Sequence, residues 1–225
     1  ALAKPGRSAA VVKADAYGLG AVPVARALRD AGCRTLFVAN VAEAAELRGA
    51  GIDCEIYVFD GARESSVDTL VELGIAPVLN DAPQCDRWVG RARALGRAQP
   101  CAIHVDTGMS RLGFAPEAFI EYMRDTPRLR ALAPHLLLTH LACADEPDHA
   151  RNALQLERFA RCRAAVPDVA TSIGNSAASL TDAQRRGDVA RPGIALYGGN
   201  PFVDRRVVPL REVVRLRAPL LQVRE

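Results

Sequence analysis

The chain has 225 residues, of which 49% are hydrophobic and 24% are charged, and its formal net charge is +3. This balance is typical of a globular protein that buries a sizeable core, and it excludes a disordered or low-complexity chain. No apolar run approaches the length of a membrane span, and the basic residues are not interleaved with aromatic ones as in many nucleic-acid-binding segments. We therefore expect neither a membrane nor a nucleic acid as a partner.

The six cysteines are scattered through apolar surroundings, without a CxxC pair or the spacing of a zinc site. This distribution predicts reduced, buried thiols in a cytoplasmic protein, and no metal site. The first residues, ALAKPGRS, include neither an initiator Met nor a hydrophobic signal segment. We therefore expect the sequence to be a piece of a longer protein.

Short apolar segments alternate with segments of helical character along the chain. Glycines such as Gly32, Gly51 and Gly74 end several helical segments, and Asp81 is placed to cap the helix that follows it. The predicted strands cover residues 9–12, 35–39, 54–59, 75–79, 101–105, 135–140, 169–173 and 189–197. The predicted helices cover residues 22–31, 41–50, 63–73, 82–95, 116–124, 148–165 and 177–184.

This alternation predicts an α/β protein with a parallel sheet, and eight strand-helix units fit a closed (β/α)8 barrel of the TIM type. An open, doubly wound sheet is the structural alternative. No GxGxxG follows the first strand, which argues against a dinucleotide-binding version of that alternative. We assign the barrel to residues 1–206. Residues 207–225 alternate apolar and basic residues and are predicted to be a linker or the first strand of a C-terminal β-domain absent from this chain.

Residues 9–20, AAVVKADAYGLG, place Lys13 at the carboxyl end of the first predicted strand, inside the protein and just before a glycine-rich turn. Burial lowers the pKa of a lysine, and a neutral amine is a good nucleophile toward aldehydes. Only two of the 29 basic residues are lysines, so arginine serves wherever a positive charge is sufficient. Position 13 is therefore expected to need an amine. The alternative is a lysine that snorkels from a strand end.

Polar residues follow several of the predicted strands, at the end of a parallel barrel where chemistry gathers. Taken singly, each has a simpler explanation: Asp106 as a turn former, Ser176 as a helix cap, Arg191 as a partner in a surface ion pair. Their arrival at one rim of the barrel is the stronger argument for a shared site. The residues are Lys13, Tyr17, Asp106, Thr107, Arg111, His140, Asn175, Ser176 and Arg191.

The chemistry of this set fits one ligand with three kinds of group. The Ser176 hydroxyl and the backbone around Gly193 can donate to a phosphate, and Arg111 suits a carboxylate or phenolate oxygen. Lys13 suits an aldehyde, and Arg191 is a permanently charged donor. An aldehyde, a phosphate and a heteroaromatic ring occur together in pyridoxal phosphate, which is the cofactor that we expect.

Five stretches of the sequence resemble the alanine racemase family, the barrel-type pyridoxal phosphate enzymes of fold type III. The stretches run in order from Ala10 to Gly198 and read AVVKADAYGLG, HVDTGMSRLGF, LTHLACADE, GNSAASL and ARPGIALYG. The resemblance implies the barrel fold and a reaction that interconverts L- and D-alanine through an aldimine on the cofactor. It also implies that the full-length protein is a homodimer.

The resemblance assigns a role to each matching residue. Lys13 holds the cofactor and is the acid or base on one face of the substrate α-carbon, and Arg111 faces the phenolic oxygen of the cofactor and the substrate carboxylate. Arg191 donates to the pyridine nitrogen, with support from His140, and so favours racemisation over side reactions. The other cofactor-binding residues are Tyr17, Ser176, Gly193 and Ile194, at the phosphate, and Asn175.

Two departures from the family pattern bear on these roles. Many members carry a carbamylated lysine two residues before Asp106, where this chain has His104, so Arg111 must be oriented by His104, by an anion or by another side chain. The family also has a C-terminal β-domain, which supplies across the dimer interface a tyrosine for the opposite face of the substrate. The four tyrosines of this chain, at 17, 57, 122 and 197, all lie in the predicted barrel.

Racemisation removes a proton on one face and returns it on the other, so one base is not sufficient. We therefore expect these 225 residues to bind pyridoxal phosphate but to racemise alanine slowly or not at all, whereas the full protein is expected to be active. Two alternatives stay open: a single-barrel pyridoxal phosphate carrier without turnover, involved in cofactor homeostasis, and a barrel enzyme that does not use this cofactor.

Overall fold

The computed structural model of the protein describes residues 6–124, 130–202 and 210–224. At its centre, seven parallel strands follow one another in chain order, so that each strand pairs with the next one along the sequence. A twisted parallel sheet built in this order curls around its own axis. The strands are β2 (Ala10–Val11), β3 (Thr35–Val38), β4 (Glu55–Val58), β5 (Ala76–Leu79), β6 (Ala102–His104), β7 (Leu136–Leu138) and β8 (Ala170–Ser172).

The first strand brings the two ends of this sheet together, because it pairs on both of its edges. β1 (Arg7–Ser8) pairs in parallel with β9 (Val189–Ala190), whereas β2 pairs with β3. The hydrogen bonds continue past the β1–β9 ladder, from the Val11 N–H to the Pro192 carbonyl at 3.0 Å. On the other side of the closure, Ser172 of β8 forms an isolated antiparallel bridge with Gly187, just before β9. The predicted α/β barrel is therefore confirmed, and the open sheet is excluded.

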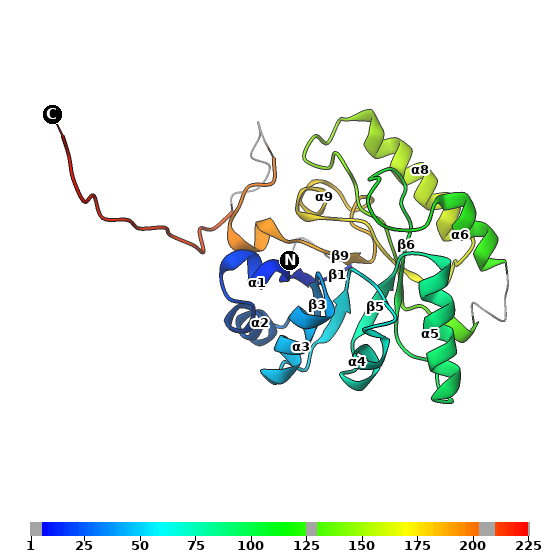
Figure 1. The fold of residues 1–225 in the computed structure, drawn as a ribbon. Coiled ribbons are helices and arrows are strands. Elements are labelled where there is room, and N and C mark those ends of the chain that lie inside the picture. Colours follow the sequence, from blue (N-terminus) through cyan, green and yellow to red (C-terminus); the bar gives the residue numbers. More distant parts are fainter. Residues whose placement is uncertain (1–5, 125–129, 203–209, 225) are drawn as a thin grey trace.

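Helices surround the strands on the outside of the barrel (Figure 1). Each predicted helix is present, although several are shorter than predicted at one or both ends. α5 begins where predicted, because the Asp81 carboxylate accepts the Gln84 N–H at 2.8 Å. The helices are α2 (Ala21–Asp30), α3 (Val41–Gly49), α4 (Val67–Glu72), α5 (Ala82–Ala94), α6 (Pro116–Met123), α8 (Ala150–Ala164) and α9 (Ser176–Thr181).

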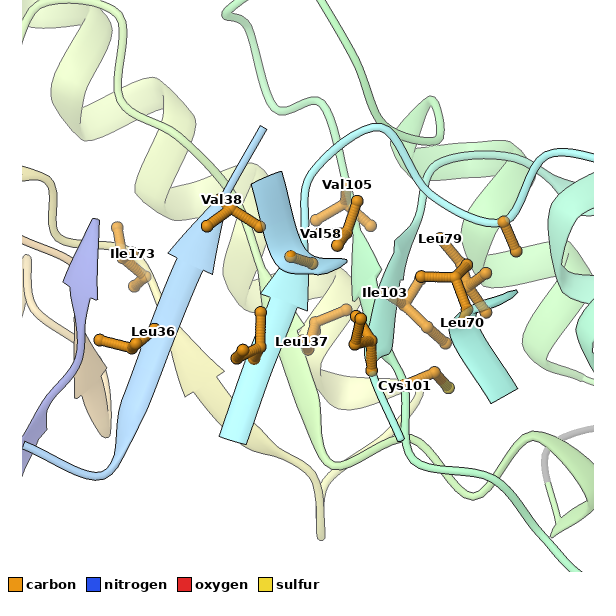
Figure 2. Packing of buried hydrophobic residues seen from close by; sticks show 14 of the residues in the cluster. Leu36, Val38, Val58, Leu70, Leu79, Cys101, Ile103, Val105, Leu137 and Ile173 are labelled. Carbon is orange, nitrogen blue, oxygen red and sulfur yellow. The ribbon is translucent and has the colours of Figure 1, made fainter. Parts of the chain in front are cut away.

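Side chains of the strands pack in two layers, one inside the barrel and one between strands and helices. In β3, Leu36 and Val38 belong to the outer cluster with the helices, whereas Phe37 belongs to the inner cluster. Successive side chains of a strand point to opposite faces, which produces this alternation. Figure 2 shows part of the outer layer, where Leu137 lies among other aliphatic side chains. In the inner layer Phe37 stacks on Tyr57, with ring centroids 4.9 Å apart.

The last predicted strand, residues 189–197, is much shorter than predicted. β9 ends at Ala190, and a 3-10 helix, η1 (Ile194–Tyr197), occupies the second half of the predicted segment. Pro192 has no N–H group to donate to a neighbouring strand. Gly193 has φ −116° and ψ −91°, outside the strand region. The prediction of a strand beyond Ala190 was therefore wrong, because its apolar residues belong to a turn over the barrel mouth.

Residues 210–224 carry no helix or strand and extend away from the barrel (Figure 1). Their large apolar side chains are exposed, with Leu216 at 96% and Leu221 at 93% of full exposure. The predicted division between residues 206 and 207 falls within 203–209, outside the described residues. The assignment of 1–206 to the barrel and 207–225 to a linker or first strand stays a prediction.

Candidate active site at the carboxyl ends of the strands

A cavity of about 550 Å³ opens at the carboxyl ends of the barrel strands. Its lining comes from loops far apart in the sequence, as expected for a site at the end of a parallel barrel. Asp106 and Thr107, expected at this rim, are not part of this lining, but all of the residues to which the resemblance assigns a role are. They are Lys13, Tyr17, Arg111, His140, Asn175, Ser176, Arg191, Gly193 and Ile194.

Lys13 begins a short turn, α1 (Lys13–Gly18), whose backbone is left-handed. Residues 14–17 have φ between 52° and 59° although none of them is glycine. This conformation costs an L-residue about 1–2 kcal/mol, so neighbouring groups have to hold it. The predicted glycine turn therefore starts earlier than expected, at Lys13 itself. The Lys13 side chain is partly buried and lines the open cavity.

Tyr17 lies at the mouth of the cavity, directly against Gly193. A Cβ atom placed on Gly193 would lie 2.1 Å from the Tyr17 hydroxyl oxygen. On its other side the Tyr17 ring packs on Tyr197, at a centroid distance of 4.9 Å. The Tyr197 hydroxyl donates to the Val11 carbonyl at 3.0 Å, which anchors the pair to the first strand. Burial raises the pKa of Tyr17, so its hydroxyl keeps its proton at neutral pH.

Ser176 receives two backbone N–H groups from the segment that follows the last strand. Its hydroxyl oxygen accepts from Gly193 at 2.9 Å and from Ala195 at 3.2 Å. The helix cap of α9 is instead Asn175, whose side-chain oxygen accepts the Ala178 N–H at 3.0 Å. The alternative explanation of Ser176 as a helix cap is therefore excluded, and its hydroxyl proton stays available to a ligand.

Arg191 is buried inside the barrel, with 3% of its surface exposed. Its guanidinium donates to the Ser172 hydroxyl and, at 2.6 Å, to the Thr139 carbonyl, and it lies over the Phe37 ring at 5.9 Å. These contacts exclude the alternative of a surface ion pair. Burial, and next the charge of Arg111, lower the pKa of Arg191 to about 9. The side chain therefore stays charged at neutral pH.

His140 lies beside these arginines as a neutral imidazole. Burial, and next the charges of Arg191 and Arg111, lower the pKa of His140 to about 3. Within the described part of the chain, the Arg191 side chain bonds to Ser172 and Thr139 and forms no hydrogen bond with the His140 ring. Both residues line the cavity, and the predicted support of Arg191 by His140 stays a prediction.

His104 is the departure from the family pattern, and its ring has one fixed hydrogen bond. The Asn80 amide nitrogen donates to the carbonyls of Phe59 at 3.0 Å and Val78 at 2.9 Å, so the amide oxygen faces His104 Nδ1 at 3.0 Å. Nδ1 therefore carries the proton. Nε2 is a buried acceptor that has no hydrogen-bond partner among the described residues. Burial, and next the charge of Arg191, lower the pKa of His104 to about 3.

Arg111 follows a tight loop that Asp106 organises. One Asp106 carboxylate oxygen accepts the N–H groups of Gly108, Met109 and Ser110 at 2.8–3.0 Å. Burial alone would raise the pKa of Asp106, but these donors outweigh it and lower the pKa. Asp106 is therefore a turn former, as its simpler explanation held. Arg111 itself is exposed at the cavity mouth, where its charge can meet an anionic ligand.

Comparison with known proteins assigns the chain to a family. A family model described as "Alanine racemase, N-terminal domain" matches residues 1–201. This chain belongs to that family. Relatives named alanine racemase include those of Methylobacterium nodulans, 46% identical over 217 residues, and Rhodospirillum rubrum, 44% identical over 223 residues. A crystal structure of alanine racemase from Bartonella henselae with covalently bound pyridoxal phosphate matches with a TM-score of 0.87 at 33% identity, over 94% of this chain.

The alanine racemase relatives are longer than this chain. The match covers 96% of this chain but 58% of the Methylobacterium nodulans protein, and it covers 61% of the Bartonella henselae chain. The chain thus spans about three fifths of the length of the alanine racemases that it resembles. The predicted family is confirmed. The activity of the whole protein is proposed below.

Several residues that line the cavity were not predicted from the sequence. Asp60 lies just beyond the end of β4 and lines the same cavity. It could have been predicted in the same way as the other site residues, as a polar residue that follows a strand. Burial raises the pKa of Asp60, although Arg63, 3.1 Å away, opposes the change. Other lining residues that were not named are Phe59, Leu112, Asp145 and Pro201.

Across residues 6–124, 130–202 and 210–224, no group of His, Cys, Asp and Glu side chains is arranged to hold a metal ion. No helix of the same residues has both the length and the apolar character needed to cross a membrane. All six cysteines are free thiols; four are buried as predicted, whereas Cys33 and Cys143 are partly exposed.

Proposed function

We propose that this chain is the pyridoxal phosphate-binding barrel of an alanine racemase, an enzyme that interconverts L- and D-alanine. The observation that carries the proposal is the convergence, in one cavity, of the Lys13 amine, the buried Arg191 guanidinium and the Ser176 hydroxyl. These groups match the aldehyde, the ring nitrogen and the phosphate of one molecule. The names of the matched relatives favour a racemase over a cofactor carrier without turnover.

The residues at one side of the cavity fit a phosphate group. Two backbone N–H groups, from Gly193 and Ala195, converge on the Ser176 hydroxyl, and Ile194 lies between them. The Tyr17 hydroxyl lies directly against Gly193, where a Cβ atom would be 2.1 Å from it. Hydroxyl groups and backbone N–H groups gathered in this way are typical of phosphate sites. We assign the phosphate to these residues, with Asn175 holding the start of α9 beside them.

Arg191 fits the pyridine nitrogen. With a pKa of about 9, the guanidinium is charged at neutral pH and donates a hydrogen bond without giving up its proton. Arg191 would thereby keep the ring nitrogen unprotonated, which would moderate electron withdrawal by the ring and favour proton exchange over side reactions. The neutral His140 adds no further positive charge beside Arg191.

Pyridoxal phosphate, when bound, supplies an electron-withdrawing ring that makes the α C–H bond of an attached amino acid acidic. Lys13 Nζ is the covalent attachment point and afterwards the group that removes or returns the α-proton on one face. Arg111 binds the substrate carboxylate and faces the phenolic oxygen of the cofactor, because its planar, charged fork suits paired oxygens. Lys13 and Arg111 are thus the proposed catalytic residues, with alanine as the substrate.

The opposite face of the substrate needs a second acid or base, and the tyrosines of this chain are already engaged. The Tyr57 hydroxyl donates to Glu55 and the Tyr122 hydroxyl to Asp86, each at 2.7 Å. Tyr197 is bonded to a backbone carbonyl, and Tyr17 is assigned to the phosphate. The second group therefore comes from polypeptide outside this chain, and the chain alone is proposed to turn over slowly or not at all.

We further propose that the whole protein is a homodimer in the cytoplasm. Apolar side chains surround the cavity mouth and are exposed, including Leu112 at 42% and Ile194 at 40%. A second polypeptide over this rim would bury them and could bring the missing acid or base. The free thiols are compatible with a reducing compartment. Sedimentation velocity of the whole protein tests the dimer, and a monomer at micromolar concentration would contradict it.

The lysine pair of this chain allows a direct test of the function. Lys13→Ala is expected to abolish the visible absorbance of attached pyridoxal phosphate and, after borohydride reduction, the mass gain on the peptide that contains position 13. Lys4→Ala is the control, since Lys4 is the only other lysine in the sequence. An absorbance band that survives Lys13→Ala would overturn the assignment of Lys13.

A second measurement addresses the reaction. The whole protein, given L-alanine, is expected to form D-alanine, and this chain alone is expected to form it at a small fraction of that rate. No D-alanine from the whole protein would overturn the racemase. Equal turnover by the chain and the whole protein would overturn the requirement for a second group from outside.

A further inference from the structure

The turn that presents Lys13 is held by a side chain from the next strand-helix unit. Glu43 lies in the first turn of α3, and one of its carboxylate oxygens accepts the N–H of Ala14 at 2.9 Å, across 29 residues of sequence. Its other oxygen accepts the N–H of Ala39 at 2.7 Å, just past the end of β3. A single carboxylate thus ties the residue after Lys13 to the end of the neighbouring strand.

The Glu43 carboxylate does not make the hydrogen bond that is usual for its position in helix α3. Asn40 caps the helix and accepts the Glu43 N–H at 3.1 Å, in the spacing of a capping box. In that motif the carboxylate returns to the N–H of the cap residue. Here Glu43 reaches to Ala39 and across to Ala14 instead. The carboxylate therefore serves the turn at Lys13 and not only the start of its own helix.

The turn needs such support because its backbone is strained. Residues 14–17 are left-handed without being glycine, and the strain has to be offset by surrounding contacts. Asp15 accepts the Ala21 N–H at 2.6 Å and so secures the far end of the turn. Ala16 is fully buried and secures its middle. Glu43 secures the end next to Lys13.

We propose that Glu43 is a positioning residue for Lys13: by holding the Ala14 amide, it fixes the direction in which the Lys13 amine enters the cavity. This inference rests on the proposed function in taking Lys13 as the amine that binds pyridoxal phosphate. Glu43 does not line the cavity, so it acts through the backbone and not by contact with a ligand.

The test replaces Glu43 in the whole protein by residues that change only the acceptor. Glu43→Gln has nearly the same shape but one acceptor oxygen, so either Ala14 or Ala39 loses its partner and meets an amide N–H. Glu43→Asp keeps the charge on a shorter stem that cannot span both N–H groups. Glu46→Gln, on an exposed position of the same helix, is the matched control.

Two readouts separate positioning from mere stability. Glu43→Gln is expected to raise the pyridoxal phosphate concentration at half-saturation of the visible band by roughly tenfold, the change set by one lost hydrogen bond to a charged group. Without cofactor, the Ala14 amide is expected to exchange its hydrogen faster, while far-UV circular dichroism is unchanged. Glu43→Asp is expected to change half-saturation and amide exchange in the same direction but less. If Glu43→Gln does not fold, the same two measurements on Glu43→Asp test the proposal. Glu46→Gln is expected to match the wild type.

Unchanged half-saturation in folded Glu43→Gln, or wild-type exchange rates at both the Ala14 and the Ala39 amides, would overturn the positioning role. Lack of attachment in the wild type and in Glu46→Gln as well would overturn the proposed function instead, and the inference with it. Hydrogen exchange is measured without cofactor. It therefore tests whether Glu43 holds the Ala14 amide, independently of whether Lys13 binds pyridoxal phosphate.

Discussion

Gly193 and Tyr17 approach each other so closely that one methyl group would force them apart. The distance that a Cβ atom on Gly193 would leave to the Tyr17 hydroxyl oxygen is 2.1 Å. The backbone at Gly193 has φ −116°, which any residue can adopt. Glycine is therefore required here for space.

Gly193→Ala is expected to displace Tyr17 and to weaken pyridoxal phosphate binding by roughly tenfold, because overpacking costs about 1–3 kcal/mol. Gly90→Ala is the matched control: it lies in α5, where a Cβ atom meets nothing within 4 Å. The control is expected to leave binding unchanged and to stabilise the protein by about 0.5–1 kcal/mol. Titrations of the visible band compare the two variants. Equal half-saturation would contradict the close approach of Tyr17.

At the scale of elements, Arg48 joins two helix ends and the start of a strand through their backbones. It lies in the last turn of α3 and donates to the carbonyls of Ile52 and Cys54, before β4, and of Leu73 and Gly74, after α4. Carbonyls at helix ends have no partner within their own helix. Arg48 satisfies them and so fixes α3 and α4 relative to β4.

Arg48→Met keeps much of the apolar stem but leaves these carbonyls without their donor. The expected loss in the free energy of unfolding is about 2–4 kcal/mol, since unpaired polar groups and lost charged hydrogen bonds both contribute. Urea unfolding of Arg48→Met measures this loss. Arg26→Met is the control, because Arg26 is exposed and makes one longer bond, 3.3 Å, to the Ala50 carbonyl; it is expected to cost about 0.5 kcal/mol or less. Matching midpoints for the two variants would show that Arg48 is not needed to join the elements.

Whole-molecule stability is expected to depend on pH through the buried histidines. The pKa of His104 is about 3 in the folded protein, against an ordinary value of 6.5. Between these values the unfolded chain binds more protons, so stability is full above about pH 6.5 and falls as the pH falls. Asp106, whose pKa is lowered from 3.8, contributes only in more acidic solution.

Urea unfolding at pH 7 and pH 5 should therefore differ by about 2 kcal/mol on account of His104 alone. His104→Asn removes the titrating group and keeps an N–H donor for Asn80. This variant should show a shallower dependence on pH over the same range. A free energy of unfolding that does not change between pH 7 and pH 5 in the wild type would contradict the neutral, buried state of His104.

Most of the secondary structure was predictable because strands buried on both faces are continuous apolar runs, and glycines or a capping aspartate mark where helices end or begin. The prediction was wrong at residues 189–197, where Pro192 and Gly193 turn the chain out of the strand although the residues stay apolar. It also missed the left-handed backbone after Lys13. Nothing local favours φ above 50° in residues 14–17; contacts from Glu43 and Asp15, formed only in the fold, stabilise it.

The sequence by itself indicated the barrel and which side chains stand at the strand ends, because apolar runs and the polar residues that follow them are local features; the family was indicated by its resemblance in five motifs. Tertiary structure alone decided which of those side chains is buried and what each one bonds to. Arg191 is enclosed and Lys13 partly open, although both follow apolar runs. The reason is that burial and hydrogen bonding depend on loops distant in the chain, which meet only when the first strand pairs with the last.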